Sequence, residues 1–199
     1  MDNVENIHKL IGREVISLES ANKLGHVADV LVDTLSGQLA GLSVRRGDST
    51  IALASILDIH SIGPDAVVVE HDQSLVLADA SPLNALAKAK EDLIGVKVMS
   101  GHGQSLGSLS NLFLCIDRRP TFIYEVRSSF LDALLGRASY FAASLGCTLS
   151  NDRTSLVVNA EPDQMHDHLE EAADRVLGRY RPLLQGPGGL HVEVRTHAE

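Results

Sequence analysis

Nine histidines are the residues of this 199-residue sequence best suited to bind a metal ion, because neutral imidazole is a common ligand of transition metals. The closest pair is His166 and His168, and a spacing of two residues places their side chains on different sides of a helix. His102 stands between two glycines in an expected surface turn. No two histidines lie four residues apart and no cluster combines His with Cys, so the sequence predicts no metal site.

Paired carboxylates could perform general acid–base catalysis, and two pairs lie near expected strand ends. They are Asp29 with Asp33, and Asp58 with Asp65. Acidic residues in such positions are more often turn caps or solvated surface groups. The glycines of residues 101–107 lack the Gly-Lys-Ser/Thr ending of a phosphate-binding loop. We therefore expect no catalytic residues, no organic cofactor and no enzymatic activity.

The two cysteines indicate a reducing environment. Cys115 and Cys147 are 32 residues apart, and each stands among apolar residues, so we expect buried free thiols. The N-terminus is acidic and polar, and no apolar run approaches the ~20 residues that a membrane span needs. The expected location is the cytoplasm, with contact to a membrane only through a partner complex.

The charge of the sequence argues against a dedicated nucleic-acid-binding protein, because the net charge is −9 and the pI is about 5.4. Arg118, Arg119, Arg127 and Arg137 form the one basic concentration. They could contact phosphate on RNA or on a lipid headgroup, or belong to an ordinary charged hairpin. The same region holds five of the seven aromatic residues: Phe122, Tyr124, Phe130, Tyr140 and Phe141. These form either a local core or an aromatic patch at an interface.

An internal repeat organises the chain. Leu10–Ser17 matches Leu93–Ser100 at a spacing of 83 residues, Leu24–Val32 matches Leu106–Leu114 at 82, and Ala66–Val69 matches Ser155–Val158 at 89. The second copy therefore contains about seven additional residues, which we place near residues 128–136. Two copies of this length indicate a duplicated small domain rather than a solenoid.

Each copy reads as a series of short strands with turns between them. The predicted strands of the first copy are Arg13–Leu18, Val27–Asp33, Leu39–Val44, Thr50–Leu53 and Val67–Glu70. Short strands at this spacing predict a small antiparallel barrel, which removes exposed sheet edges by closing. The fold class expected is mainly β, with two such barrels in tandem and a C-terminal amphipathic α-helix.

The sequence predicts two segments outside the barrels. Ser81 as N-cap and Pro82 as first residue start a short helical stretch between the copies. A longer helix is predicted over residues 163–181, ending before Pro182, with one apolar face made of Met165, Leu169, Ala172, Ala173, Val176, Leu177 and Tyr180. After it, Leu190–Arg195 alternates apolar and polar residues as a last strand or an adhesive tail would. The predicted domains are residues 1–80 (first barrel), 81–90 (linker), 91–162 (second barrel) and 163–199 (helix and tail).

The first copy resembles the PRC-barrel family. The resemblance rests on Leu10-Ile11-Gly12, Leu24–Asp33, Ile51–Ile59 and Ile62–Val69, and it covers most of residues 8–72. Residues 91–160 resemble a divergent member that departs at Arg118-Arg119-Pro120 and at Asn151–Thr154. The family shares its fold with the cytoplasmic domain of the photosynthetic reaction-centre H subunit and with the C-terminal domain of the RimM ribosome-maturation factor.

The resemblance implies an adaptor or docking module without catalytic residues. The expected function is a non-enzymatic protein-interaction module that binds a protein partner or a second copy of itself. An accessory role in ribosome or RNA maturation, or in a photosynthetic or other membrane-associated complex, is the alternative. The candidate interaction surface consists of Arg118, Arg119, Arg127, Phe122, Tyr124, Leu169, Val176, Leu177 and Tyr180.

Overall fold

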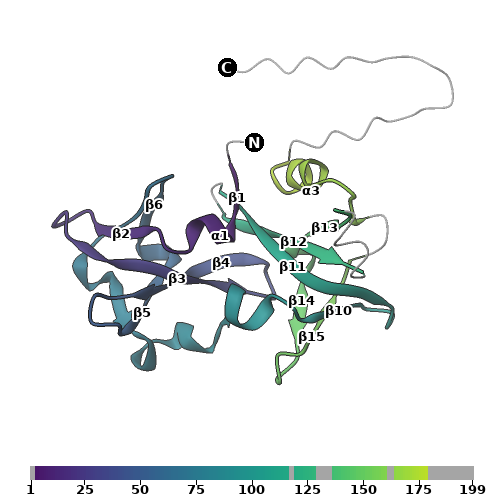
Figure 1. Ribbon diagram of the computed structural model, residues 1–199, viewed down its shortest axis with the longest axis horizontal. Coiled ribbons are helices and arrows are strands. Elements are labelled where there is room, and N and C mark those ends of the chain that lie inside the picture. Colours follow the sequence, from purple (N-terminus) through teal and green to yellow (C-terminus); the bar gives the residue numbers. More distant parts are fainter. Residues whose placement is uncertain (1–2, 117–118, 129–135, 161–163, 179–199) are drawn as a thin grey trace, which may run out of the picture.

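The computed structural model describes residues 3–116, 119–128, 136–160 and 164–178 (Figure 1). The fold is mainly β, with 48% of residues in strands and 21% in helical segments. Among the described residues, no helix is long and apolar enough to cross a membrane. The predicted class is therefore right at the level of a β-rich protein.

The first half forms a set of strands with one parallel pair. Its strands are β2 (Glu14–Ser17), β3 (Lys23–Asp33), β4 (Gln38–Arg45), β5 (Ile51–Ser55), β6 (Ile59–Ile62), β7 (Ala66–Val69) and β8 (Leu75–Leu77). Strands β2 to β5 pair antiparallel in sequence order, and β6 pairs antiparallel with β7. Strand β7 then runs parallel to β2, with Glu14 opposite Ala66.

The second half repeats these pairings. Its strands are β10 (Lys97–Ser100), β11 (Ser105–Cys115), β12 (Thr121–Arg127), β13 (Ser139–Ala142), β14 (Cys147–Leu149) and β15 (Ser155–Val158). Strands β10 to β13 pair in order, β14 pairs with β15, and β15 runs parallel to β10 with Lys97 opposite Ser155. The spacings of 83 and 89 residues between the copies are thus also the spacings between equivalent paired positions.

The two halves exchange short strands. Near the N-terminus, β1 (Val4–Asn6) and the helical turn α1 (Ile7–Leu10) precede β2, and β1 pairs with β11 of the second half. Between the halves, β9 (Ala87–Lys88) and the π-helical turn η5 (Ala89–Leu93) precede β10, and β9 pairs with β3 of the first half. Strand β1, which precedes the first half in sequence, therefore completes the second half. Strand β9, which precedes the second half, completes the first half.

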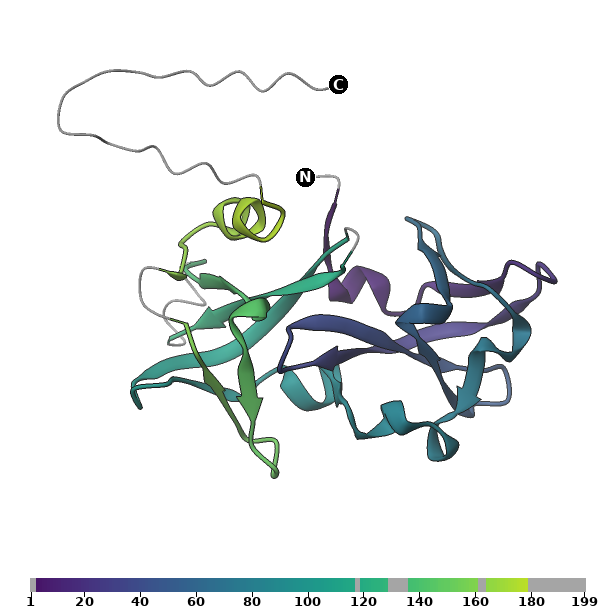
Figure 2. The same ribbon diagram turned by 180° about the vertical axis from the view of Figure 1, so that it is seen from behind.

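A third contact between the halves is also reciprocal. Leu39 N–H donates to the Pro120 carbonyl over 2.9 Å, and Phe122 N–H donates to the Gly37 carbonyl over 2.9 Å. These bonds join β4 to β12, so the sheet runs continuously from β14 to β6 (Figures 1 and 2). The main hydrophobic core draws residues from both halves. The observed arrangement is one open sheet over a main core shared by both halves, whereas the sequence predicts two closed barrels in tandem.

Equivalent glycines allow the two paired strands of each long hairpin, β3–β4 and β11–β12, to approach closely. Gly25 and Gly107 lie at irregular positions of the β2–β3 and β10–β11 pairs. A β-carbon on Gly107 would overlap the carbonyl oxygen of Arg127, and one on Gly25 would overlap that of Arg45. The repeated Leu-Gly motif therefore marks places where two backbones approach too closely for a side chain.

Short 3-10 turns connect or follow several of the strands. In the first half, the 3-10 turns η3 (Ala78–Ala80) and η4 (Pro82–Ala85) lie against β5, and Ser81 caps η4 as predicted, accepting from Leu83 N–H. The remaining 3-10 turns are η1 (Ile56–Asp58), η2 (Asp72–Ser74) and η6 (Ala143–Leu145).

The C-terminal helix α3 (Leu169–Val176) is shorter than the predicted helix over 163–181. The prediction is wrong at its start, because His166 pairs with Tyr140 as an extended bridge before α3 begins. It also misses the signal at the end, where Gly178 follows the last turn with φ of 66° and stops the helix before Pro182. Tyr180, Pro182 and the rest of 179–199 lie outside the described residues.

Candidate interaction surface

The predicted basic concentration does not form one patch. Arg119 is exposed before β12, whereas Arg127 lies at the opposite end of the same strand. Arg127 also binds Glu125, with Nη2 2.8 Å and Nε 2.9 Å from the Oε1 atom. Glu125 is buried, so Arg127 compensates an internal carboxylate rather than presenting a free cation. Arg118 lies outside the described residues.

The aromatic residues of the candidate surface belong to the core. Phe122 and Tyr124 are completely buried, and the Tyr124 ring packs edge-to-face on Phe141 with the ring centres 5.5 Å apart. The prediction of an aromatic interface is wrong for these two residues. The hydroxyl of Tyr124 is buried and has no hydrogen-bond partner among the described residues, and burial raises its pKa well above the usual value.

The apolar side of α3 also faces the protein itself. Leu169, Val176 and Leu177 are half-buried and pack with Ala172 and Ala173 against the outer face of β11 and β12. On that face the strands contribute Cys115 and Ile123, which are buried, and Phe113, which is partly buried. These helix residues therefore dock in cis, and their role as a binding surface for another molecule is limited to the parts left exposed.

The two acidic residues of the first predicted pair, Asp29 and Asp33, have different structural roles. Asp33 closes its own hairpin, because its carboxylate accepts from Leu35 N–H over 3.0 Å and from the Ser36 hydroxyl over 2.7 Å. Asp29 is only 5% exposed and accepts from backbone N–H groups of the segment between the halves. These two carboxylates, four residues apart, therefore each accept hydrogen bonds that hold a turn in place.

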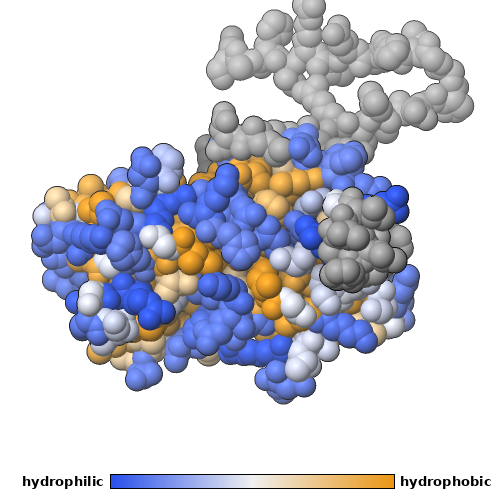
Figure 3. All heavy atoms as spheres, in the orientation of Figure 1, coloured by the Kyte–Doolittle hydropathy of each residue, from blue (hydrophilic) through white to orange (hydrophobic). Residues whose placement is uncertain are grey.

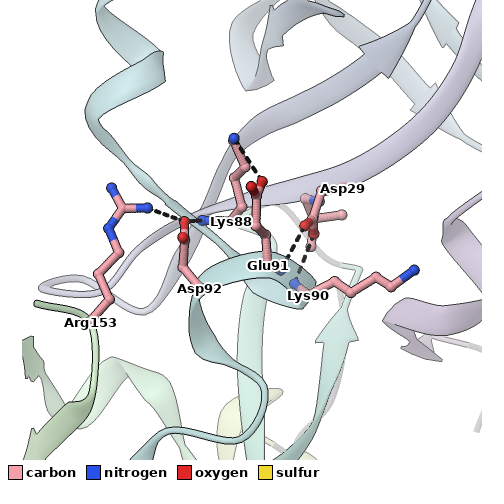
Figure 4. A network of polar contacts seen from close by, with 7 residues as sticks. Asp29, Lys88, Lys90, Glu91, Asp92 and Arg153 are labelled. Carbon is pink, nitrogen blue, oxygen red and sulfur yellow. Dashed lines mark hydrogen bonds and ion pairs between the residues drawn. The ribbon is translucent and has the colours of Figure 1, made fainter.

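Asp29 holds the turn η5 against the first half (Figure 4). One carboxylate oxygen accepts from Lys90 N–H over 2.9 Å and the other accepts from Glu91 N–H over 3.0 Å. Burial raises the pKa of Asp29, although these N–H groups lower it. Asn111, the aligned residue of the second copy, shares with Asp29 only the bond from the next N–H group: Leu112 N–H donates to Asn111 over 2.9 Å and Val30 N–H donates to Asp29 over 2.8 Å.

Asp92 continues the same network toward the second half. Its carboxylate accepts from Lys88 N–H over 2.7 Å and forms an ion pair with Arg153 in the β14–β15 turn (Figure 4). The Lys88 side chain pairs in turn with Glu91 over 2.8 Å. The segment between the halves is thus bonded to both of them and fixes how they sit together.

A buried ion pair fixes the N-terminal strand. Arg13 is 8% exposed and forms two contacts with the Glu5 carboxylate, one of them 3.1 Å long, and it also donates to the carbonyls of Lys9 and Gly63. The equivalent residue of the second copy is Val96, which is buried. Sequence reasoning missed this contact, because the aligned position changes from Arg to Val.

The nucleophilic side chains are placed in unreactive settings. Burial raises the pKa of the Cys115 thiol to about 11 and that of Cys147 to about 12, so both remain protonated at neutral pH. Gly103, Ser105 and Gly107 have the Gly-x-Ser-x-Gly spacing of a nucleophile elbow, which the sequence reasoning overlooked. Ser105, however, begins β11 in a hairpin and not a strand-to-helix turn.

Within the described ranges, no three His, Cys, Asp or Glu residues form a group that could hold a metal ion.

Several large apolar side chains are left in solvent on the described surface. Leu57 is 88% exposed in η1, and Leu35 is 73% exposed in the turn between β3 and β4. Leu18, Leu77, Val76 and Val157 are between 41% and 53% exposed. None of them belongs to the predicted surface, and their exposure could be recognised only once the sheet faces were known.

Comparison with known proteins identifies a family for the first part of the chain only. Residues 2–76 match the PRC-barrel domain, which is less than half of the 199 residues. The match includes the exchanged strand β1 and ends within β8. A search of curated proteins finds no match.

Proposed function

We propose that the protein is a non-enzymatic interaction module built from two PRC-type barrel units. The observation that carries the proposal is the match of residues 2–76 to the PRC-barrel domain, together with the repetition of its strand pairings in the second half. The second unit lies outside the family match, and its assignment rests on the repeated register alone. The exchange of β1 and β9 supports a two-unit body that acts as one rigid piece.

The chemistry of the polar groups supports a binding role over a catalytic one. Asp29 and Asp33 are occupied by cap contacts, and both thiols are held protonated by burial. Polar groups that complete internal contacts in this way stabilise the fold and are poorly placed to activate a substrate.

The exposed apolar side chains supply the means to test the proposal. Leu57 is the most exposed large apolar residue among those described, and an apolar side chain in the centre of an interface contributes strongly to binding. The tagged full-length protein is used to capture partners from native lysate, and each enriched protein is then purified and titrated calorimetrically. We expect a saturable complex of defined stoichiometry.

Two variants distinguish specific binding from charge effects. Leu57→Asp is expected to weaken the complex at least tenfold if its end of the first half is the contact, while Gln73→Asp adds the same charge at an exposed polar position and leaves affinity unchanged. Enrichment of ribosomal proteins, or of subunits of a membrane complex, would favour the corresponding accessory role. Absence of any saturable partner would contradict the proposal.

A further inference from the structure

In the first half, the segment that follows β8 packs back on the same half. Beyond β8, the turns η3 and η4 lie against β5. The next residues, Ala87–Lys88 of β9, then pair with Val32 and Leu31 of β3. The segment that follows the first unit in sequence therefore covers the edge of β3 at Leu31 and Val32.

In the second half, the equivalent edge of β11 is paired with β1. The bridge between Tyr140 and His166 corresponds to the pairing of β5 with β8, and α3 then lies against β12 and β13. The position on β11 equivalent to that of β9 on β3 is Phe113 and Leu114, but β1 pairs there. The chain that leaves α3 therefore cannot follow the path of its first-half counterpart.

Strand β1 has a second edge, opposite β11, near the apolar cluster on which α3 packs. In the part of the chain that the structure describes, β11 is the one strand that pairs with β1. Val4 of β1 belongs to the same apolar cluster as Val176 and Leu177 at the end of α3. Hydrophobic side chains gather on the surface between β1 and α3 (Figure 3). The N–H and C=O groups of a strand edge are a template for a further strand.

The sequence beyond α3 contains a segment of suitable length and pattern. Twenty-one residues follow Gly178, and among them Leu190–Arg195 alternates apolar and polar residues with the period of a strand. The intervening residues 179–189 span at most about 36 Å when extended. This length is ample, because Val4 of β1 packs on the same apolar cluster as Val176 and Leu177 of α3.

We propose that residues 190–195 bind in cis to the free edge of β1 as an additional strand. The apolar residues Leu190, Val192 and Val194 then face the cluster that contains Val4. The C-terminal segment occupies an edge that an extended segment of another protein would otherwise use. The inference concerns the chain's own terminus and stands apart from the proposed adaptor role.

Hydrogen exchange in the full-length protein tests this pairing. In the variant Val192→Asp/Val194→Asp, the outward-facing amides of Val4–Asn6 are expected to lose at least tenfold of their protection, because their strand partner is removed. The control His191→Asp/His197→Asp adds the same charge on the polar side of the segment and is expected to retain wild-type protection. Equal exchange in all three proteins would overturn the proposal.

A peptide of residues 188–197 provides an independent measurement. Labelled peptide is expected to bind the Val192→Asp/Val194→Asp protein at least tenfold more tightly than the wild type, in which the tethered segment competes at an effective concentration near the millimolar range. Failure of the peptide to bind the variant would also overturn the proposal. Light scattering that shows a doubled mass for the wild type, lost in this variant, would mean that the segment pairs with a second copy instead.

Discussion

Replacing Tyr124 by Phe tests whether the buried hydroxyl of this residue destabilises the core. The hydroxyl has no hydrogen-bond partner among the described residues, and the side chain is completely buried. An unsatisfied buried polar group costs about 1–3 kcal/mol. The substitution Tyr124→Phe removes that cost and keeps the ring that packs on Phe141 at 5.5 Å.

The expected gain is smaller than the full cost, because removal of the oxygen leaves a small void in the core. We expect the free energy of unfolding to rise by about 1 kcal/mol at pH 7, which corresponds to a rise in Tm of about 2–4 °C for a protein of this size. Urea unfolding and calorimetry measure the two quantities. Tyr140→Phe is the matched control, because Tyr140 is half-buried and its loss of a hydroxyl is expected to change stability little.

The alkaline arm of the same experiment gives a second readout. Burial raises the pKa of Tyr124 well above its usual value near 10, so the folded state keeps the proton when the unfolded state loses it. The contribution is fully present below pH 10 and is lost as pH rises further, at about 1.4 kcal/mol per pH unit. The phenylalanine variant lacks this loss. If Tyr124→Phe instead lowers stability at pH 7, the hydroxyl has a partner such as an ordered water molecule, and the reasoning is refuted.

Two further predictions concern the thiols and the close approach of the paired strands β11 and β12. Burial raises the pKa of Cys115 to about 11 and that of Cys147 to about 12. The free energy of unfolding is therefore expected to fall between pH 9 and 10 by up to about 2.7 kcal/mol per pH unit, because the thiols lose their protons first in the unfolded state. Urea unfolding under reducing conditions should show a shallower fall in the Cys115→Ala/Cys147→Ala variant. Gly107→Ala is expected to cost about 3 kcal/mol or more in thermal unfolding, because the added β-carbon meets the Arg127 backbone at φ of 126°. Gly103→Ala, with open space around a φ of 80°, should cost only about 1–2 kcal/mol, and equal losses would contradict the steric explanation.

The strand pattern and the duplication follow from local sequence. The strands β2, β4 and β7 lie close to their predicted ranges, because alternation of apolar and polar residues requires one buried and one exposed face. The repeat spacings of 83 and 89 residues reappear as equivalent parallel pairs. The cap at Ser81 could also be predicted from the sequence, because a Ser before Pro at a helix start accepts a hydrogen bond from a backbone N–H group two residues later.

The candidate surface could be predicted only in part. Leu169, Val176 and Leu177 share one face of α3 as their spacing requires, but periodicity does not say against what that face packs. Phe122 and Tyr124 are apolar or amphipathic residues on a strand, and whether they face a core or a partner depends on which sheet covers them. Solvent exposure is a property of the packed molecule and leaves no separate mark on composition.

What the sequence alone determined is the β-rich, duplicated organisation, because period and spacing are properties of consecutive residues. The exchange of β1 and β9 between the halves was decided by tertiary structure. So was the role of Asp29, whose partners Lys90 and Glu91 lie about 60 residues away. A strand edge or a buried carboxylate pairs with whichever N–H groups the folded chain brings to it, and local sequence does not specify which those are.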